Sequence, residues 1–280
     1  MKVIEFLRHP ADDTRPAFTE TEAAAPIPGP HDLLVRVEAV SINPVNTKVR
    51  RNLVPVPDTV NVLGWDAAGT VIACGSDVLL FAPGDNVFYA GTFTRSGSNA
   101  ELHLVDERMV GNMPASLNYA QAAAMPLTGL TAWQLLFDRL QVPASKTFNT
   151  GSLLVLGGAG GVGSILIQLA QRLTGLTIIA TASRREGVDW CLNMGAHHVI
   201  DHGGSLPEQV AALAVPPVTH VASFTHTDKH MAAIAQIVAP HGKVGAIDDH
   251  DFLDITPLKA KSASFHWEMV FTRPLFDTLI

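Results

Sequence analysis

A glycine-rich segment in the second half of the chain has the residue types and spacing of a phosphate-binding loop. Gly158-Ala159-Gly160-Gly161-Val162-Gly163 fits the pattern G-x-G-x-x-G, directly after the apolar run Leu153 to Leu156. In such a loop the first glycine permits a tight turn, the second lets the backbone approach a pyrophosphate, and the third lets helix and strand pack closely. The helix that follows offers N–H groups and a positive dipole end to the anion. The alternative is a glycine-rich turn without a ligand, which the regular alternation of strands and helices further along disfavours.

The residues after the second predicted strand indicate which dinucleotide the loop binds. That strand covers Leu176 to Thr181, and a carboxylate at its end would bind the ribose 2′-hydroxyl of NAD. Instead, Ser183, Arg184 and Arg185 follow, and a hydroxyl with two guanidinium groups suits a phosphate. The sequence therefore favours NADPH over NADH. The alternative is that both arginines are solvated residues at a helix start.

The elements that position this loop alternate regularly. Apolar strands separated by helices predict a doubly wound parallel sheet of the Rossmann type, with helices on both faces. The predicted strands cover residues 153–156, 176–181, 198–201, 218–224 and 243–247, with a sixth in 262–270, and the predicted helices cover about 162–173, 186–194, 206–213 and 228–238.

The first part of the chain has a different pattern, with short predicted strands and few predicted helices. Leu33 to Val40 alternates apolar and polar residues, as a half-buried strand does, and 69–74 and 85–89 are further predicted strands. This β-rich module runs to about residue 115, and predicted helices at 120–125 and 131–140 follow it. The sequence thus predicts an α/β protein of two domains, with boundaries at 1–117 and 118–280.

Composition limits the partners and the compartment. With 280 residues, 47% hydrophobic and 16% charged, the chain is too apolar for intrinsic disorder. A formal net charge of −7 excludes a basic surface for nucleic acid or anionic membrane, so the expected partner is a small molecule. The only cysteines, Cys74 and Cys191, cannot build a disulfide framework. Without a signal peptide or spanning segment, the prediction is a cytoplasmic protein.

The order of the two modules and the glycine loop resemble the medium-chain dehydrogenase/reductase superfamily. Ser41 to Lys48, Leu63 to Val71 and Thr128 to Trp133 look like its quinone oxidoreductase branch, more closely the zinc-type alcohol dehydrogenase-like proteins. The resemblance covers essentially all of the chain. It implies a GroES-like domain over 1–117 and a Rossmann NADP-binding domain over 118–280.

Within this resemblance the zinc ligands are missing. Zinc-dependent relatives carry a Cys near Asn43-Pro44, a Gly-His-Glu where this chain has Gly64-Trp65-Asp66, and a four-Cys lobe after the segment around Val87. His226 and His230 have a spacing that can chelate a metal on one helix face, but no third ligand is evident, and the alternative is histidine at the surface or at a helix terminus. We therefore expect no metal.

The resemblance also implies which residues carry the chemistry. Hydride transfer to a quinone or an α,β-unsaturated carbonyl produces a delocalised phenolate or enolate that hydrogen-bond donors can stabilise. The resemblance places Asn43 and Tyr89 near such a substrate, where the amide would donate to the carbonyl oxygen and the hydroxyl would donate or deliver a proton. It places Thr128 near the nicotinamide and, less firmly, Thr225 and Ile247 along the cofactor cleft. Each of these residues also has a purely structural alternative. Asn43 could simply form a turn, Tyr89 could be a strand residue that packs on its neighbour Phe88, and Thr128 could cap a helix.

The sequence thus predicts a zinc-independent oxidoreductase that transfers hydride from NADPH to a quinone or enone. A catalytically silent NADPH-binding protein and a zinc alcohol dehydrogenase, the latter disfavoured by the missing ligands, are the alternatives. Family members continue well beyond the position of Ile280, so we expect a C-terminally truncated member whose return segment into the first domain is absent. In relatives the last strand often pairs across a dimer, and a homodimer through 262–270 is expected here.

Overall fold

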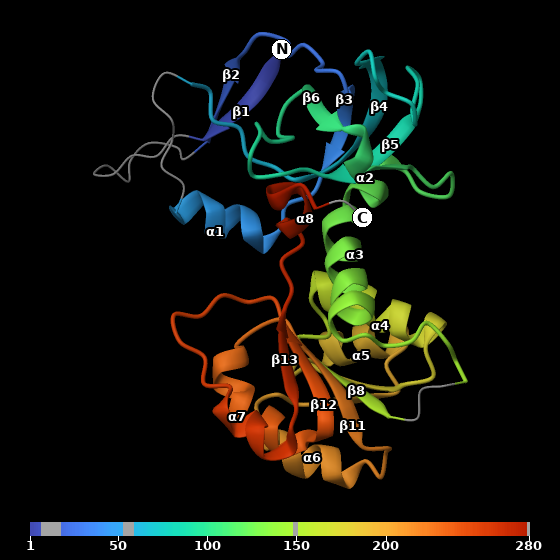
Figure 1. The fold of residues 1–280 in the computed structure, drawn as a ribbon, viewed down its shortest axis with the longest axis vertical. Coiled ribbons are helices and arrows are strands. Elements are labelled where there is room, and N and C mark those ends of the chain that lie inside the picture. The colour runs from blue at the N-terminus through green and yellow to red at the C-terminus, as the bar shows by residue number, and fades with distance from the viewer. Residues whose placement is uncertain (7–17, 53–58, 148–150, 279–280) are drawn as a thin grey trace. The chain divides into compact units, whose positions relative to one another are not determined.

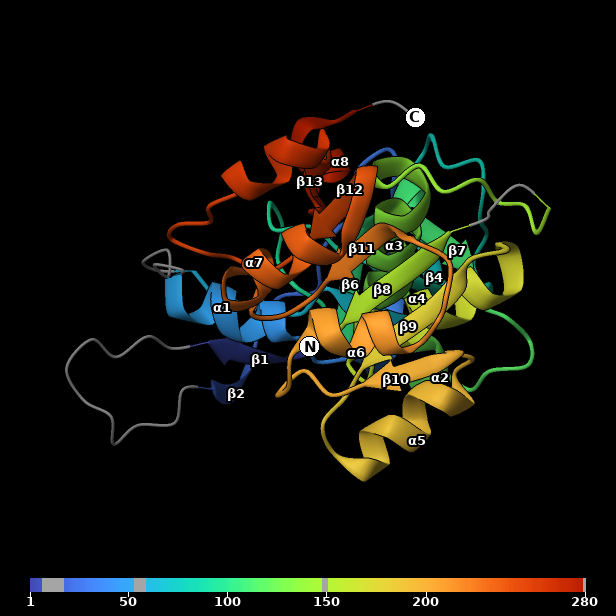
Figure 2. The same cartoon turned by 90° about the horizontal axis from the view of Figure 1, so that it is seen from below.

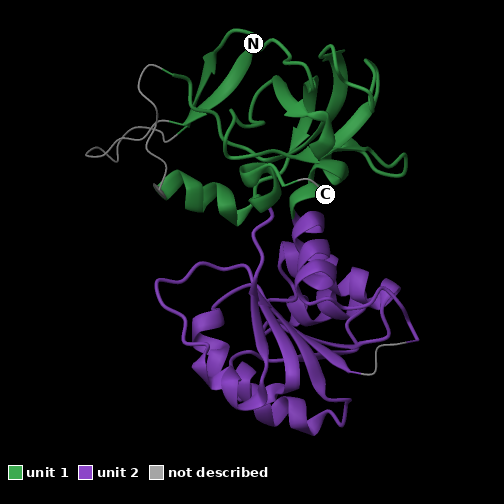
Figure 3. Cartoon of the chain, in the orientation of Figure 1, with its two compact units in different colours: residues 1–127, 271–280 green, residues 128–270 purple. Residues whose placement is uncertain are grey.

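The computed structural model describes residues 1–6, 18–52, 59–147 and 151–278, which form two compact units (Figure 3). Unit 1 consists of residues 1–127 and 271–280, and unit 2 of residues 128–270. The division comes later than the predicted boundary after residue 117, because the helix α2 (Tyr119–Ala123) packs on the strands of unit 1. Among the described residues, every helix is too short or too polar to cross a lipid bilayer.

Unit 1 is built on an antiparallel sheet of five strands with the order β6-β3-β4-β5-β7 (Figure 1). The strands predicted at 33–40, 69–74 and 85–89 correspond to β3, β4 and β5. The bounds are β3 (Asp32–Val40), β4 (Asp66–Cys74), β5 (Asn86–Ala90), β6 (Leu102–Asp106) and β7 (Val110–Asn112), and a separate antiparallel pair consists of β1 (Lys2–Phe6) and β2 (Phe18–Glu22). Side chains of one face of this sheet form an apolar core, which includes Leu33, Val35, Val87 and Tyr89.

Short helices accompany these strands. Asn118 begins α2 through a capping box: its side chain accepts from the backbone N–H of Gln121, and the Gln121 side chain accepts from the backbone N–H of Asn118. The helix α1 (Pro44–Asn52) was not predicted, and it begins with a proline, which suits the first turn of a helix. The remaining short elements are η1 (Glu107–Met109) and α8 (Thr272–Phe276).

The last described residues, from Phe271 on, belong to unit 1, whereas the prediction from the sequence placed them in the Rossmann domain. Phe271 is buried, with its ring 4.0 Å from that of Phe93 and 6.3 Å from that of Trp65. The physical reason is this aromatic cluster, which removes a large apolar ring from water. Leu279 and Ile280 lie outside the described residues.

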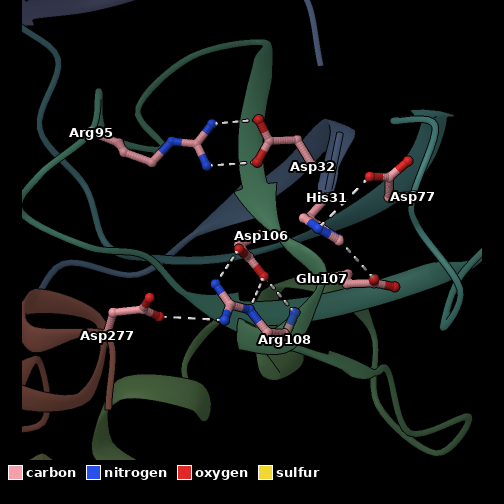
Figure 4. Close-up of polar contacts among 8 residues, drawn as sticks. All are labelled: His31, Asp32, Asp77, Arg95, Asp106, Glu107, Arg108 and Asp277. Carbon is pink, nitrogen blue, oxygen red and sulfur yellow. Dashed lines mark hydrogen bonds and ion pairs between the residues drawn. The ribbon is translucent and has the colours of Figure 1, made fainter. Parts of the chain in front are cut away.

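Charged side chains of unit 1 pair along β3, β6 and η1 (Figure 4). Arg95 donates to both carboxylate oxygens of Asp32, at 2.7 and 2.8 Å. Arg108 contacts Asp106 at 2.9 Å and Asp277 at 3.4 Å, and thereby links η1 to the residue after α8. Because Arg108 and Asp277 are exposed, this second contact contributes little free energy, and the aromatic cluster supplies most of the anchoring.

Unit 2 has the predicted parallel sheet, with six strands in the order β10-β9-β8-β11-β12-β13. Consecutive strands run outward from β8 in two directions, so the strand order reverses beside β8, as in a doubly wound fold. The bounds are β8 (Ser152–Leu156), β9 (Thr177–Thr181), β10 (His198–Ile200), β11 (Val218–Ser223), β12 (Val238–Ala246) and β13 (Ser264–Trp267).

Helices cover both faces of this sheet (Figure 2). Leu153 and Val155 of β8 face a core with the helix α4, and Leu154 and Leu156 face a second core with α6 and α7. A strand buried on both faces explains why its sequence is continuously apolar. The helices are α3 (Pro126–Trp133), continued by the π-helical η2 (Gln134–Arg139), then α4 (Gly161–Leu173), α5 (Arg185–Asn193), α6 (Leu206–Ala212), α7 (Thr227–Ile237) and the 3₁₀ turn η3 (Thr256–Lys261).

Candidate functional site

The glycine loop of unit 2 connects β8 to α4 at the carboxyl end of the sheet. Gly157, one residue before the G-x-G-x-x-G pattern, has φ = +81°, so the conformation that favours glycine lies there and not at Gly158. A Cβ on Gly158 would lie 2.8 Å from Cβ of Ala180 and 3.1 Å from Sγ of Cys191. Gly158 is therefore required by packing against β9 and α5.

The other glycines of the loop differ in what surrounds them. A Cβ on Gly163 would lie 2.5 Å from the carbonyl oxygen of Gly157, so α4 packs directly on the loop. A Cβ on Gly160 would meet only that same oxygen, at 3.3 Å. The space above Gly160 is thus available to a ligand, beside the N-terminus of α4 where the first-turn N–H groups lack intrahelical partners.

Several predicted cofactor residues lie against this loop. The methyl carbon Cγ2 of Thr128 would be 3.2 Å from a Cβ on Gly161, and Cγ2 of Thr225 would be 3.2 Å from a Cβ on Gly157. Ile247 follows β12, and its N–H donates to the carbonyl oxygen of Ser223 at the end of β11. Val162 lies in the first turn of α4 and packs against the core beneath it. Unit 2 therefore brings the predicted cofactor residues of the loop and of the neighbouring strand ends together.

Sequence reasoning missed one polar residue that holds the loop. The hydroxyl of Thr181, the last residue of β9, accepts from the backbone N–H of Gly157 at 3.0 Å. This bond fixes the start of the loop to the second strand. Thr181 ends the predicted strand 176–181, so the sequence indicates its position, whereas its bond to Gly157 depends on how the two strands pack.

Ser183, Arg184 and Arg185 follow β9 after one buried residue, Ala182, and all three are exposed. Arg184 is the residue before α5 and Arg185 is its first residue, with 92% of its side chain accessible and Nε 4.0 Å from a carboxylate oxygen of Asp189. A contact of this length between exposed groups leaves the guanidinium available to another anion. The arrangement suits the phosphate group expected there.

The predicted substrate residue Asn43 lies in unit 1, immediately before α1. Its side-chain Nδ2 donates to Oδ2 of Asp66, the first residue of β4, at 2.9 Å. The other oxygen of Asp66 accepts from the backbone N–H of Leu127 at 3.1 Å. Asp66 is fully buried, and burial raises the pKa of its carboxyl group to about 7, although both hydrogen bonds act in the opposite direction. Sequence reasoning identified no partner for Asp66, because Asn43 is distant along the chain.

Tyr89, the second predicted catalytic residue, lies in the core of unit 1. Its hydroxyl is 3.0 Å from Nδ1 of His103, and Nε2 of that histidine is 2.9 Å from the carbonyl oxygen of Ser96. The carbonyl requires a donor, so the proton of the imidazole is on Nε2 and the Tyr89 hydroxyl donates to Nδ1. Burial raises the pKa of Tyr89 above its usual value and lowers the pKa of His103 to about 4. This placement favours a core role for Tyr89 over the predicted transfer of a proton.

The residues at the positions of zinc ligands do not fit a zinc site. The amide of Asn43 is used by Asp66, and the indole of Trp65, which has no lone pair for a metal, donates to the carbonyl oxygen of Thr92 at 3.1 Å. His226 precedes α7 with φ = +52° and so does not share a helix face with His230. Within the described residues, no group of three His, Cys, Asp or Glu side chains could hold a metal ion.

Comparisons with known proteins agree with the two units. Residues 29–126 match the alcohol dehydrogenase GroES-like domain, and residues 161–266 match the family described as zinc-binding dehydrogenase. A zinc-type alcohol dehydrogenase-like protein of Staphylococcus aureus is 40% identical over 99% of this chain and 83% of its own length.

Solved structures extend this similarity to the fold. A protein of Rhizobium etli named after the zinc-dependent alcohol dehydrogenases is 51% identical, with a TM-score of 0.93 over 99% of this chain and 81% of its own. Escherichia coli quinone oxidoreductase, solved in complex with NADPH, is 25% identical, with a TM-score of 0.82 over 96% of this chain and 81% of its own. The chain belongs to the medium-chain dehydrogenase/reductase superfamily, a family of oxidoreductases, and within it to the quinone oxidoreductase branch.

Proposed function

We propose that the protein is a zinc-independent reductase that transfers hydride from NADPH to a quinone or an α,β-unsaturated carbonyl compound. The observation that carries the proposal is the loop of unit 2, in which Gly160 leaves room for a pyrophosphate while Arg184 and Arg185 stand exposed after the neighbouring strand. The NADPH complex of the Escherichia coli relative supports this choice of cofactor.

The residues of unit 2 would hold the cofactor. The first-turn N–H groups of α4 would bind the pyrophosphate, with Gly158 and Gly163 keeping the loop close to the sheet. Arg184 and Arg185, with the hydroxyl of Ser183, would bind the 2′-phosphate. The residues Thr128, Thr225 and Ile247 would line the remaining length of the cofactor. When bound, NADPH supplies the hydride, and the protein supplies binding and orientation.

In unit 1 we assign the substrate oxygen to Asn43. Its Nδ2 carries two hydrogens, of which one is donated to Asp66, so the second can be donated to a carbonyl oxygen that becomes negative during the reaction. Tyr89 receives no role in proton transfer, since its hydroxyl is committed to His103. The proposal uses no metal, because the side chains at the ligand positions are an amide and an indole.

The test is the consumption of NADPH by the purified protein with a panel of small quinones and enones, followed by the absorbance of the reduced nicotinamide. We expect turnover with NADPH that exceeds turnover with NADH. Heat of NADPH binding in calorimetry without turnover of any acceptor would instead support the silent NADPH-binding protein. Oxidation of simple alcohols together with stoichiometric zinc would support the zinc alcohol dehydrogenase.

Two expectations about the protein as a whole stay predictions. A homodimer through the last strand is compatible with the position of β13 at the end of the sheet order, and light scattering of the purified protein tests it. The cytoplasmic location also stays a prediction, for which fractionation of cells is the test.

A further inference from the structure

The backbone and side chain of Asn43 are both fixed within unit 1. Its backbone N–H donates to Oδ1 of Asn46 at 2.8 Å, and its carbonyl oxygen accepts from the backbone N–H of Asn46 at 2.9 Å. These two bonds fix the backbone where α1 begins. The rotation of the side-chain amide is then decided by the bond from Nδ2 to Asp66.

The carboxylate of Asp66 can accept a hydrogen bond from Asn43 only when the Asn43 amide turns its NH₂ group towards it. Its backbone oxygen accepts from the N–H of Ser41 at 2.9 Å, and its strand pairs with β5, where Ala90 is opposite. One carboxylate oxygen is used by the N–H of Leu127, which is part of the backbone and cannot turn. The second oxygen therefore faces the Asn43 amide and requires a donor from it.

We propose that Asp66 is a positioning residue that sets the orientation of the Asn43 carboxamide and thereby directs its second N–H to the oxygen of the substrate. The inference rests on the proposed function, because it assigns a substrate oxygen to Asn43. A donor displaced by about 1 Å can lower a rate about 100-fold, so the orientation of one amide is sufficient to control turnover.

The ionised form of Asp66 is the one that fits this arrangement. Protonation of the oxygen that faces Asn43 places an O–H against an N–H donor, and the amide must turn to present its oxygen instead. The groups facing the carboxyl are the Asn43 amide from the start of α1 and the Leu127 N–H from α3, and neither titrates. Burial raises the pKa of Asp66 to about 7, so the switch falls in an accessible pH range. We expect turnover to increase as the pH rises through this value.

The variant Asp66→Asn tests the proposal because it has the same size and mimics the protonated form. The amide oxygen of the substituted side chain would accept from Leu127, and its NH₂ group would then force the Asn43 amide to turn. We expect kcat to fall on the order of tenfold to 100-fold at pH 8 and to lose its dependence on pH, with the KM for NADPH unchanged.

A double-mutant cycle shows whether Asp66 acts through Asn43. If it does, Asp66→Asn has little further effect on kcat in a protein that already carries Asn43→Ala. Additive losses from the two substitutions would overturn the proposal. The matched control is Glu107→Gln, because Glu107 is also buried in unit 1 and accepts from two backbone N–H groups, those of Leu79 and Leu80. This variant should keep the pH profile of the wild-type protein.

A second measurement does not depend on activity. In nuclear magnetic resonance spectra of the substrate-free protein, the side-chain amide signals of Asn43 are those that Asn43→Ala removes. They should shift with pH at the same midpoint as the ¹³C carboxyl signal of Asp66, and Asp66→Asn should abolish this shift. Asn43 amide signals whose chemical shifts do not change as Asp66 titrates would overturn the proposal. If the wild-type protein reduces no quinone or enone, the proposed function fails, and the amide titration alone decides whether Asp66 sets the orientation of Asn43.

Discussion

The ring of Tyr89 lies parallel to that of His103, with centroids 5.5 Å apart and planes inclined by 9°, and its hydroxyl is 3.0 Å from the imidazole Nδ1. The pair bridges β5 and β6 inside unit 1. Since the histidine is neutral and its other nitrogen donates to a carbonyl, the Tyr89 proton completes a closed hydrogen-bond chain. Tyr89, to which the family resemblance gave a catalytic role, is therefore placed as a core residue.

The first prediction is that Tyr89→Phe affects stability and not catalysis. Removing the hydroxyl leaves Nδ1 of His103 without its donor, which should lower the free energy of unfolding by about 1–3 kcal/mol. The kcat for quinone reduction should change less than twofold. Tyr119→Phe is the matched control, because its hydroxyl bonds to Asn86 in an exposed setting. A loss of turnover at unchanged stability would restore the catalytic assignment of Tyr89.

The second prediction concerns the pH dependence of stability. Burial lowers the pKa of His103 from its usual 6.5 to about 4. Between these values the unfolded chain binds a proton that the folded protein does not, so the free energy of unfolding falls as the pH falls, by at most about 1.4 kcal/mol per pH unit. The raised pKa of Asp66 acts with the opposite sign, because there the folded protein binds the extra proton between pH 3.8 and about 7.

Urea unfolding at several pH values between 4 and 7 separates these contributions. His103→Asn should leave the protein more stable at acid pH, relative to pH 7, than the wild-type protein. His220, whose pKa burial also lowers to about 4, keeps its own contribution in this variant. Asp66→Asn should leave the protein less stable at acid pH on the same comparison. Equal slopes in the wild-type protein and His103→Asn would show that the histidine titrates normally in the folded state.

The strands of unit 2 could be predicted because burial on both faces leaves a continuous apolar run, as in β8. The fifth strand was predicted to begin at residue 243, and the regular pairing of β11 with β12 resumes there, at His220 and Lys243. The part of β12 before residue 243 was not predicted, because it contains Pro240 and Gly242, which normally interrupt strands. The helix α1 could not be predicted, because its sequence is mostly polar and its stability depends on tertiary contacts.

The candidate site could be predicted where one local segment carries the chemistry, as in the glycine loop. The pair of Asn43 and Asp66 could not, because it joins a helix start to a strand start and depends on how the sheet of unit 1 folds. The only available signal was a lone carboxylate in the otherwise uncharged segment Leu63 to Val71. The core position of Tyr89 could not be predicted either, because the sequence does not indicate which face of the sheet a side chain occupies until the strand register is known.

The third prediction separates ligand binding from packing within the glycine loop. Gly160 has φ = −76°, which alanine adopts readily, and its Cβ would meet only one oxygen. The 3.3 Å contact with the Gly157 oxygen requires only a small shift of the loop, so Gly160→Ala should lower the melting temperature much less than Gly163→Ala. It should weaken NADPH binding by at least about tenfold, or ~1.4 kcal/mol. Gly163→Ala should lower the melting temperature, because its Cβ would overlap the backbone of the loop. Calorimetry and thermal unfolding measure the two effects, and unchanged affinity in Gly160→Ala would contradict the pyrophosphate site.

The fourth prediction concerns the choice between the two nicotinamide cofactors. Hydrogen bonds to charged groups contribute about 1.5–3 kcal/mol, so Arg184→Ala or Arg185→Ala should raise the KM for NADPH roughly tenfold to 100-fold. The KM for NADH should not change. Arg172→Ala, an exposed arginine in the last turn of α4, is the matched control. Equal effects on both cofactors would show that the arginines do not contact the 2′-phosphate.

The fifth prediction tests the aromatic cluster that anchors the last described residues to unit 1. Phe271 is 3% exposed and packs on Phe93 and Trp65, so Phe271→Ala should lower the stability of unit 1 by about 3–5 kcal/mol. Phe276→Ala, at a ring that is 75% exposed, should change it by less than about 0.5 kcal/mol. Because the chain folds as two units, hydrogen exchange reports each one separately. Protection should fall in β4 and β5 and stay the same in β8 and β9, and a uniform loss across both sheets would contradict the assignment of Phe271 to unit 1.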